Sequence, residues 1–573
     1  MGGGFSHNGK TLLSGVDPAG RADKIADAVP VMDGTLYFCP SPLFGYGLER
    51  LLSRLTDAPH SALLCIESDP ELFALSQKHF SDSLRSNTKL RLTNKCEAGA
   101  LCVLLRQEWG PRFFRRIQTV RLSGGWQLSP ALYNMLAESL QREIALDWGN
   151  AMTLTKLGRL YIRNALRNLP LIPRWPSLAR LSFGRRPLLV LGAGSSLDST
   201  LDVLSRRFGE TCKLPQTRPF GIVCVDTCLP ALRERGITPD LVVILESQHW
   251  NLGDFTGLSG WKIPAAFDLS AYPRSGTVLS GGLFLFFTPW TKLRIFDRLE
   301  AAGILPAALP PLGSVGLSAV AIACRLTQGV ILTAGLDFSF TLDSYHARST
   351  PGHSGKLRRQ NRLTSLLNAE AAFDGAVFSL ISKVEGTDTV KSGDRVLSDP
   401  AMRRYRDLFE REFSADHRLF DIVGSGLPLG IKTLSPEVAF GILSGDNDAE
   451  EVPCGDNLMT SLTVTSAVSN SIIAEKLRIF IQNEQDCLIL LRNLLTASVS
   501  MDYTALDTLI NECDYLWAHF PDYAAADCRP VIEEIKAGKS SAVSFLKRLR
   551  VEIDPFLRLL DYCKEQLMDY RYP

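Results

Sequence analysis

Short apolar runs alternate with helical patterns through residues 185–435. The runs are long enough for buried strands and lie at 187–192, 221–225, 240–245, 283–287 and 329–335. Stretches with apolar residues every third or fourth position lie between several of them, at 198–208, 227–235 and 314–326. This alternation predicts an α/β domain, with a mostly parallel, doubly wound sheet and helices on both faces.

Residues 1–150 show a shorter version of the same pattern. Thr35–Cys39 and Ala62–Ile66 are strand-like runs, and each is followed by a helical stretch. We therefore predict a Rossmann-like N-terminal domain. Glu67 stands at the end of the second strand, where a carboxylate can accept hydrogen bonds from ribose hydroxyls. The alternative, which we favour, is a domain of this fold without a ligand.

Three further regions differ in character. Residues 151–184 are expected to form a basic helical connector, and the polar, acidic stretch 436–470 a linker. Residues 471–573 carry an apolar face at helical spacing, which predicts a helical C-terminal domain. Pro555 is expected to interrupt its last helix.

Composition and charge narrow the class of protein. The chain has 573 residues, enough for about two to four domains, and a net charge of +1, which gives no case for nucleic-acid binding. No apolar run is long enough to span a membrane, and the first residues do not resemble a secretory signal. The thirteen cysteines form no Cys-x-x-Cys pair and the histidines no metal-ligand spacing. We expect a cytoplasmic protein without a metal site.

The first predicted strand of the central domain runs into a glycine turn, Gly192-Ala-Gly194-Ser195-Ser196, and then a helix. Gly192 and Gly194 are expected to supply positive φ and close backbone approach. Amides at the helix start, helped by the Ser195 and Ser196 hydroxyls, would attract an anion. A dinucleotide is disfavoured, because Leu197 replaces the third small residue and the next strand-end acid, Asp226, lies too far along.

Polar residues follow several other strands of the central domain. The carboxyl ends of parallel strands share one sheet edge, where ligands bind. A second helix start, Gly313-Ser314, can also receive a phosphate. The predicted nucleotide- or phosphate-binding residues are Gly192, Gly194, Ser195, Ser196, Asp226, Thr227, Gly313 and Ser314. The predicted substrate-binding residues are Glu246, Ser247, Gln248, Asn251, Asp337, Ser339 and Tyr345.

The ordered set of motifs resembles a known domain. The segments Gly192–Leu197, Val225–Leu232, Gly236–Val243, Gly313–Val315 and Gly335–Ser339, with Tyr345-His346-Ala347, are similar to the MptE-like domain, named for a 6-hydroxymethylpterin diphosphokinase. The flanking layout resembles the motility-associated-factor (Maf) proteins, whose central domain is of this kind. The resemblance covers about residues 185–435.

The resemblance implies a role for His346, which matches the position of a general base in related sialyltransferases. Imidazole is suited to removing a proton from an attacking hydroxyl near neutral pH. His249 and His353 are weaker candidates. This chain departs from the family at Ser195, where proline is usual, and at Glu246, where aspartate is common.

The resemblance implies a Maf-type glycosyltransferase that moves a nonulosonic, sialic-acid-like sugar from a CMP-sugar to a protein serine or threonine, with flagellin the expected acceptor. No cofactor or metal is required for this reaction. One alternative is an ATP-dependent pyrophosphokinase acting on 6-hydroxymethylpterin, which needs Mg²⁺ and for which Asp226, Asp240 and Asp337 are candidate ligands. A second alternative is a non-catalytic nucleotide-binding protein. The sequence does not define the oligomeric state.

Overall fold

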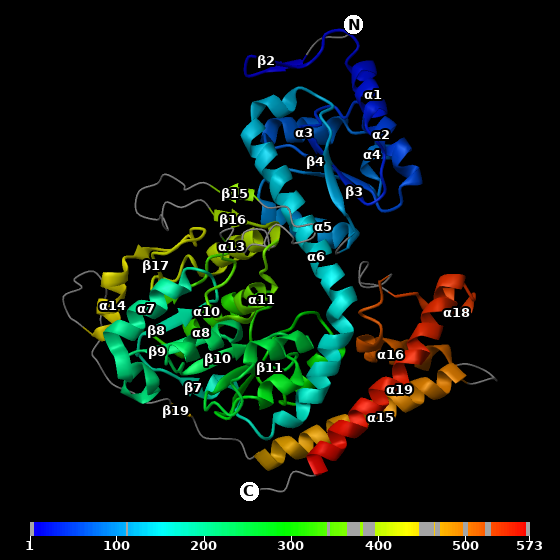
Figure 1. Ribbon diagram of the computed structural model, residues 1–573. Helices are drawn as coiled ribbons and strands as arrows, with labels where there is room; N and C mark the ends of the chain where they lie inside the picture. The colour runs from blue at the N-terminus through cyan, green and yellow to red at the C-terminus, as the bar shows by residue number, and fades with distance from the viewer. Residues whose placement is uncertain are drawn as a thin grey trace. The chain divides into compact units, whose positions relative to one another are not determined.

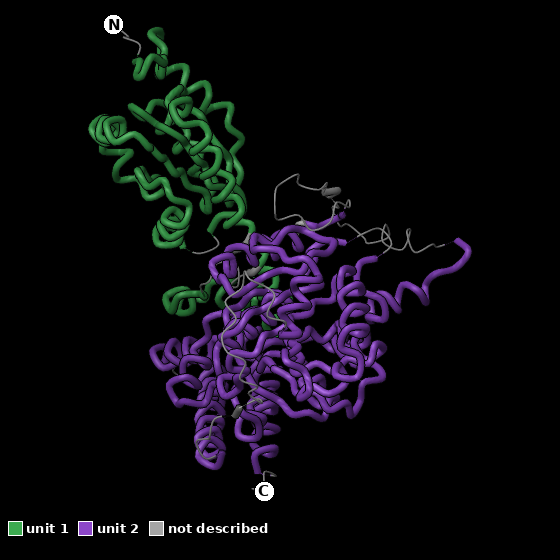
Figure 2. The backbone as a smooth tube through the Cα atoms, turned by 90° about the vertical axis from the view of Figure 1, so that its left-hand side faces the viewer, with its two compact units in different colours: residues 1–159, 515–546 green, residues 160–514, 547–573 purple. Residues whose placement is uncertain are grey.

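The computed structural model of the chain divides into two compact units. It describes residues 5–110, 113–340, 344–363, 379–381, 396–445, 463–464, 470–496, 502–521 and 529–568. Unit 1 comprises residues 1–159 and 515–546, and unit 2 comprises 160–514 and 547–573 (Figure 2). The chain thus leaves unit 1, builds most of unit 2, contributes residues 515–546 to unit 1, and returns to unit 2 with residues 547–573. The described residues after Asn470 are mainly helical, as predicted, and they belong to both units.

Unit 1 contains a parallel sheet of four strands in the order β5-β4-β3-β6; Figure 1 labels its two central strands, β3 and β4. These strands are β3 (Thr35–Pro40), β4 (Ala62–Ile66), β5 (Leu90–Thr93) and β6 (Arg116–Thr119). Alternate side chains point to opposite faces, so Tyr37 packs with α1 and α2 while Phe38 packs with α5 and α6. The predicted Rossmann-like arrangement is confirmed. The remaining elements are β1 (Phe5–His7), β2 (Lys10–Leu13), α1 (Pro18–Ala28), α2 (Leu48–Arg54), α3 (Pro70–His79), α4 (Asp82–Arg85), α5 (Ala98–Trp109) and α18 (Ile532–Lys536). Helix α6 (Pro130–Asn168) begins in unit 1 and belongs to unit 2 from residue 160 onward.

Glu67, the candidate ribose ligand of unit 1, is engaged by its own domain. Its side chain is 1% exposed and accepts hydrogen bonds from the Ser41 hydroxyl at 2.6 Å and the Tyr133 hydroxyl at 3.3 Å. Burial raises the pKa of this carboxyl. Gly47 approaches the Ala22 backbone so closely that a Cβ would lie 2.8 Å from the carbonyl oxygen. The glycine and the acid therefore both serve packing within unit 1.

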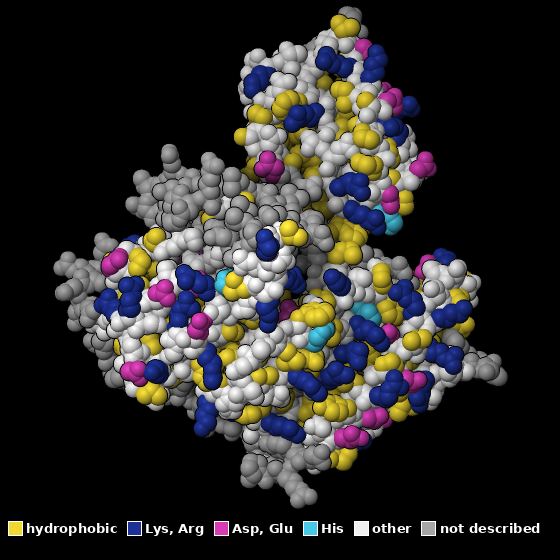
Figure 3. Space-filling model, in the orientation of Figure 1, with side chains coloured by type: hydrophobic (Ala, Val, Ile, Leu, Met, Phe, Trp, Pro, Cys, Tyr) yellow, Lys and Arg dark blue, Asp and Glu magenta, His cyan; other side chains and the backbone are white. Residues whose placement is uncertain are grey.

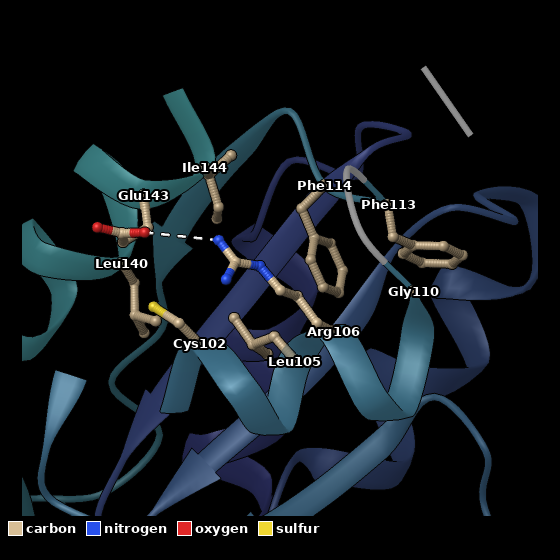
Figure 4. A pocket seen from close by; sticks show the side chains of 9 residues that line it. All are labelled: Cys102, Leu105, Arg106, Gly110, Phe113, Phe114, Leu140, Glu143 and Ile144. Atoms are coloured by element: carbon tan, nitrogen blue, oxygen red, sulfur yellow. Dashed lines mark ion pairs between the residues drawn. The ribbon is translucent and has the colours of Figure 1, made fainter. Parts of the chain in front are cut away.

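A small cavity lies between α5 and α6 (Figure 4). It has a volume of about 30 Å³ and is lined mainly by apolar side chains, with the Arg106–Glu143 ion pair (3.6 Å) among the lining groups. Nucleotide sites need several hundred Å³. This cavity is the size of a water molecule, so it offers no room for a nucleotide.

Unit 2 is built on a nine-stranded sheet in the order β13-β12-β11-β10-β9-β8-β14-β17-β18, and every neighbouring pair is parallel. The predicted parallel α/β fold is confirmed, including the five strands expected from the apolar runs. The strands are β8 (Leu188–Leu191), β9 (Gly221–Val225), β10 (Leu241–Ile244), β11 (Ala265–Asp268), β12 (Leu283–Phe287), β13 (Ala307–Ala308), β14 (Ile331–Ala334), β17 (Leu419–Ile422) and β18 (Thr433–Leu434).

The strand order reverses between β8 and β14. From β8 the chain adds strands in one direction as far as β13, and it then returns to place β14 on the other side of β8. In open α/β sheets, ligands bind at the carboxyl end of the strands beside such a switch point. The Gly192–Leu197 turn and the residues after β14 lie at this position. The topology thus selects one place along the predicted edge.

Helices cover the sheet of unit 2. Helix α10 (Val315–Leu326) lies against β8, β9, β10 and β14, and nine of its twelve residues are buried. The other helices are α7 (Leu197–Phe208), α8 (Leu229–Glu234), α9 (Arg294–Ala301), α11 (Pro351–Arg359), α13 (Pro400–Phe413), α14 (Pro436–Ser444), α15 (Asn470–Thr496), α16 (Tyr503–Glu512) and α19 (Ser540–Met568). Short pairs of strands are formed by β7 (Leu181–Ser182) with β19 (Thr463–Val464) and by β15 (Ser379–Ile381) with β16 (Val396–Ser398).

Several elements differ from the prediction. Strand β11 was missed because Ala-Ala-Phe-Asp lacks a β-branched residue, and β17 because it carries Asp421, which accepts from the Thr333 hydroxyl at 2.8 Å. Helix α14 occupies the first residues of the predicted linker. Helix α19 continues through Pro555. Buried apolar residues around the proline offset the lost hydrogen bond, among them Leu549, Ile553, Phe556, Leu559 and Leu560.

Asp240, a candidate magnesium ligand under the pyrophosphokinase alternative, lies at the other edge of the sheet. It immediately precedes β10, and its carboxylate pairs with the fully buried Arg218 and, at 3.2 Å, with Arg186. It also accepts from the Ile222 amide at 2.8 Å. Asp240 therefore fixes the amino ends of strands β9 and β10, away from the ligand edge.

We expect Arg218→Met to be strongly destabilising. The substitution leaves the Asp240 carboxylate buried with an incomplete set of partners, which costs on the order of 3–5 kcal/mol. The measurement is the free energy of urea unfolding. The exposed pair Lys213–Glu210 (2.6 Å) is the matched control, and Lys213→Met should change stability by less than about 1 kcal/mol. Equal effects of the two substitutions would contradict the role given to Arg218.

Candidate functional site

The β8–α7 turn is held by Asp337, which follows β14. The Asp337 carboxylate accepts from the backbone amide of Ser196 at 2.9 Å and from the Ser196 hydroxyl. The sequence predicts that the turn presents this amide to a phosphate. The start of helix α7 already has a carboxylate partner at that amide, because the positive end of a helix attracts any nearby anion.

The glycines of the turn permit this contact. Neither Gly192 nor Gly194 has a positive φ, so that part of the expectation is wrong. Close approach is confirmed, but the neighbour is protein. A Cβ on Gly192 would lie 2.4 Å from the Gly335 carbonyl oxygen, and one on Gly194 would lie 2.4 Å from the Asp337 carboxylate. Gly335 does have a positive φ (+71°) and would meet the Gly192 carbonyl oxygen at 2.6 Å.

The loop after β14 is strained at Phe338. Its φ of +48° is unusual for a bulky side chain, and residues of this kind concentrate at functional sites. The strained residue separates Asp337 from Ser339, which is 4% exposed. Gly426, in the loop after β17, approaches Asp337 so closely that a Cβ would lie 2.8 Å from its Cα. Sequence reasoning missed Gly426, because β17 itself was missed.

The segment that carries His346 lies on the same turn. The amide of Ala347 donates to the carbonyl of Ala193 at 3.0 Å, and the amide of Arg348 donates to the Asp198 carboxylate at 3.1 Å. Residues 344–350 therefore cross the start of helix α7. The structure brings together the glycine turn and the predicted general base, which are about 150 positions apart in the sequence.

His346 is largely enclosed. Burial, with a further contribution from the charge of Lys356, lowers its pKa to about 4. Gly352 packs on the ring, where a Cβ would lie 2.9 Å from Nδ1. Tyr345 lies beside it with ring centroids 4.7 Å apart. The imidazole is therefore neutral at physiological pH and can accept a proton.

A second group of acids lies after β9 and β10. Asp226 is 2% exposed and Asn251 is 3% exposed, and the Asn251 amide donates to Asp226 at 2.6 Å and to Asp254 at 3.3 Å. Thr227 donates weakly to Asp254. Burial raises the pKa of Asp226 to about 6, and burial together with the neighbouring Asp226 raises that of Asp254 to about 7. Displaced pKa values of this kind are typical of functional sites. Asp254 was not predicted, since it follows no strand directly.

The charge of Glu246 acts on two tyrosines that come from distant helices. Tyr161 lies on α6 and Tyr405 on α13, and burial with the nearby Glu246 charge contributes to the raised pKa of both phenols, which for Tyr161 reaches about 12. Gly313, the second predicted phosphate-binding turn, packs on Tyr405, where a Cβ would lie 3.3 Å from the ring. Neither tyrosine carried a signal in the sequence, because each lies within an ordinary amphipathic helix.

Helix α6 also binds the sheet edge directly. The Asn164 amide donates to the carbonyls of Ser247 (2.9 Å) and Ser270 (3.1 Å), and Asn168 donates to those of Leu269 and Ala271. Buried Asp268 ends β11 nearby, and burial raises its pKa to about 6. The edge therefore continues beyond the residues that were predicted.

Several predicted residues are placed differently from the central group. Ser247 is buried, and its backbone carbonyl accepts a hydrogen bond from the Asn164 side chain. Gln248 accepts from the exposed Trp250, on which His249 stacks with centroids 3.7 Å apart. His353 lines a surface hollow of about 440 Å³, together with Arg348 and Ser349 of the His346 segment. Within the described ranges, no group of three or more potential metal-binding side chains comes together.

Comparison with known proteins shows the family to which the chain belongs. The family described as 6-hydroxymethylpterin diphosphokinase MptE-like matches residues 163–343. An uncharacterized protein of Treponema pallidum (strain Nichols) is 30% identical over 541 residues, which cover 92% of this chain and 88% of that protein. The chain belongs to the MptE-like family.

A solved structure shares the fold of this MptE-like protein. The Maf glycosyltransferase of Magnetospirillum magneticum AMB-1 matches with a TM-score of 0.51 over 98% of this chain and 88% of that one, at 14% sequence identity. The resemblance predicted from the ordered motifs is thereby confirmed, both for the domain and for the Maf architecture. In the part of the chain that the structure describes, no helix is long and apolar enough to cross a membrane.

We expect Gly194→Ala to destabilise this MptE-like protein by about 1–3 kcal/mol, because the added Cβ displaces the Asp337 carboxylate from Ser196. Urea unfolding measures the effect. Gly441→Ala is the control, since a Cβ there meets no atom within 4 Å inside helix α14, and alanine should be neutral or stabilising by about 0.5–1 kcal/mol. A neutral Gly194→Ala variant would contradict the packing described.

We expect Asp254→Asn to stabilise the protein at pH 8 by about 2 kcal/mol. The raised pKa of Asp254 means that the folded protein disfavours the ionised carboxylate at this pH, and asparagine carries no charge. The folded-state pKa of Asp254 is above that of the unfolded chain. Its contribution to stability is therefore complete below pH 4 and is lost as the pH rises through about 7. Unfolding free energies measured from pH 4 to pH 8 should show the difference growing over that range. The exposed Asp297→Asn variant should show no such trend.

Proposed function

We propose that this MptE-like protein is a cytoplasmic glycosyltransferase that moves a nonulosonic sugar from a CMP-activated donor to a serine or threonine of a protein, flagellin being the expected acceptor. The family membership and the fold shared with a Maf glycosyltransferase support this proposal. The nucleotide would occupy the sheet edge beside the β8–β14 switch point, where parallel α/β sheets bind ligands.

One observation carries the proposal. The His346 segment is hydrogen-bonded to the β8–α7 turn through Ala347 and Ala193 (3.0 Å), so a neutral imidazole lies beside the edge where the nucleotide is expected. A base must be near the donor, because the acceptor hydroxyl attacks the anomeric carbon that the phosphate leaves.

The chemical step can be written with these groups. The acceptor hydroxyl oxygen forms a bond to the anomeric carbon while the bond from that carbon to the phosphate oxygen breaks. The electron pair of the broken bond stays on CMP, and His346 takes the hydroxyl proton. The lowered pKa of His346 keeps the imidazole unprotonated before the reaction but also weakens it as a base, so proton transfer requires a change in its surroundings that raises this pKa when the donor is bound.

The residues fit a pyrophosphokinase less well. Of the three acids that were candidate magnesium ligands, Asp240 lies at the opposite sheet edge and Asp337 holds the Ser196 amide. Asp226 remains, but both of its carboxylate oxygens already accept hydrogen bonds, one from the Asn251 side-chain amide and one from the Thr227 backbone amide. A monophosphate leaving group makes no comparable demand for a metal.

The proposal predicts that CMP binds and that binding survives removal of divalent metal. Thermal unfolding with CMP or ATP, each with and without EDTA, measures this. Stabilisation by CMP in the presence of EDTA is the expected result. Stabilisation by Mg-ATP alone would contradict the transferase and support the pyrophosphokinase.

His346→Ala should retain CMP binding and lose about 10²–10⁴-fold in sugar transfer. Transfer from a CMP-nonulosonate to purified flagellin is the assay, followed by mass spectrometry. His249→Ala is the matched control, because His249 is exposed and stacks only on Trp250 in the described structure. Unchanged transfer by the His346 variant would refute the assignment of the base.

A further inference from the structure

A phosphate bound at the carboxyl ends of the strands would lie near several aspartate side chains. Asp226, Asp268 and Asp337 are each no more than 2% exposed there, whereas many Lys and Arg side chains lie on the outer surface of unit 2 (Figure 3). The Ser196 amide at the start of α7, the usual position for a phosphate, is bound to Asp337. An anionic ligand therefore needs a cation that reaches the edge from another element.

Lys356 is such a cation. It lies on α11, one turn after Gly352, so both residues face His346. Its Nζ atom is shielded from solvent and lies 5.0 Å from the centre of the Tyr345 ring. The ring holds the ammonium from one side by a cation–π contact.

The position of Lys356 is fixed relative to the glycine turn. The Thr350 side chain caps α11, with its hydroxyl accepting from the His353 amide and donating to the Ala347 carbonyl at 2.7 Å. Ala347 in turn donates to Ala193 in the turn. The ammonium is thus tied through the helix start to the segment that carries His346. The neighbouring cations Arg358 and Arg359 are exposed and do not share this constraint.

We propose that Lys356 binds the phosphate of the CMP donor and balances the charge that this phosphate gains when the sugar leaves. This inference rests on the proposed transferase function and names the group that receives the leaving charge. The phosphate diester of the donor carries one negative charge and the CMP product carries two near neutral pH, so a fixed cation favours the transition state over the ground state.

The same ammonium has a second consequence for the reaction. Its charge contributes to keeping His346 unprotonated before the donor arrives. A bound phosphate offsets that charge, and the imidazole then becomes a better proton acceptor as the acceptor hydroxyl attacks. One residue therefore couples donor binding to the basicity of His346.

The test compares CMP with cytidine, which lacks the phosphate, by isothermal titration in EDTA. We expect wild-type protein to prefer CMP, and Lys356→Met to lose about 10- to 100-fold in CMP affinity while its cytidine affinity changes less than about threefold. Lys356→Arg should retain part of the preference. Lys262→Met is the matched control, because Lys262 is exposed and precedes β11 at the opposite edge of the sheet.

The outcomes separate this inference from the proposed function. An unchanged preference for CMP in both folded Lys356 variants would refute the role of Lys356 and leave the transferase intact. Equal losses for CMP and cytidine would indicate a structural effect and also count against it. Failure of wild-type protein to bind either CMP or cytidine would overturn the proposed function and this inference together.

Discussion

The contact between Asp337 and the start of helix α7 organises the candidate site. It joins β8 and β14, the two strands between which the strand order reverses. It also requires glycine at positions 192, 194 and 335, where the two loops approach each other most closely. Because the carboxylate satisfies the Ser196 amide and hydroxyl, the segments after β8 and β14 are locked together. The His346 segment then rests on this assembly through Ala193. A ligand at the switch point would therefore contact three segments that are hydrogen-bonded to one another.

Stability and chemistry conflict along this edge. Buried carboxylates with raised pKa values cost folding free energy near neutral pH, since the folded protein disfavours the ionised state that each would adopt in water. A packing role alone would be served better by apolar residues. The same edge is supported by groups that cost less, such as the two α6 asparagines that satisfy four backbone carbonyls. This contrast supports the candidate site independently of the family resemblance.

Acids at the two edges of the sheet have different roles. Asp240 and Asp226 both flank buried strands, but Asp240 pairs with two arginines and fixes the amino ends, whereas Asp226 shares Asn251 with another acid at the carboxyl ends. A strand-end carboxylate in the sequence does not reveal which partner it meets. Only the arginine that approaches from a neighbouring segment distinguishes the structural acid from the candidate functional one.

The sequence by itself determined the elements with strong periodicity: the parallel α/β class, the five apolar strands, the helix starts at Leu197 and Val315, and the set of polar strand ends. These follow from local burial patterns. Tertiary structure alone decided the strand order, the occupation of the helix start by Asp337, and the approach of Tyr161, Tyr405 and Lys356. Those contacts join segments far apart in the chain, and each depends on which strand lies beside which, a choice that no local pattern encodes.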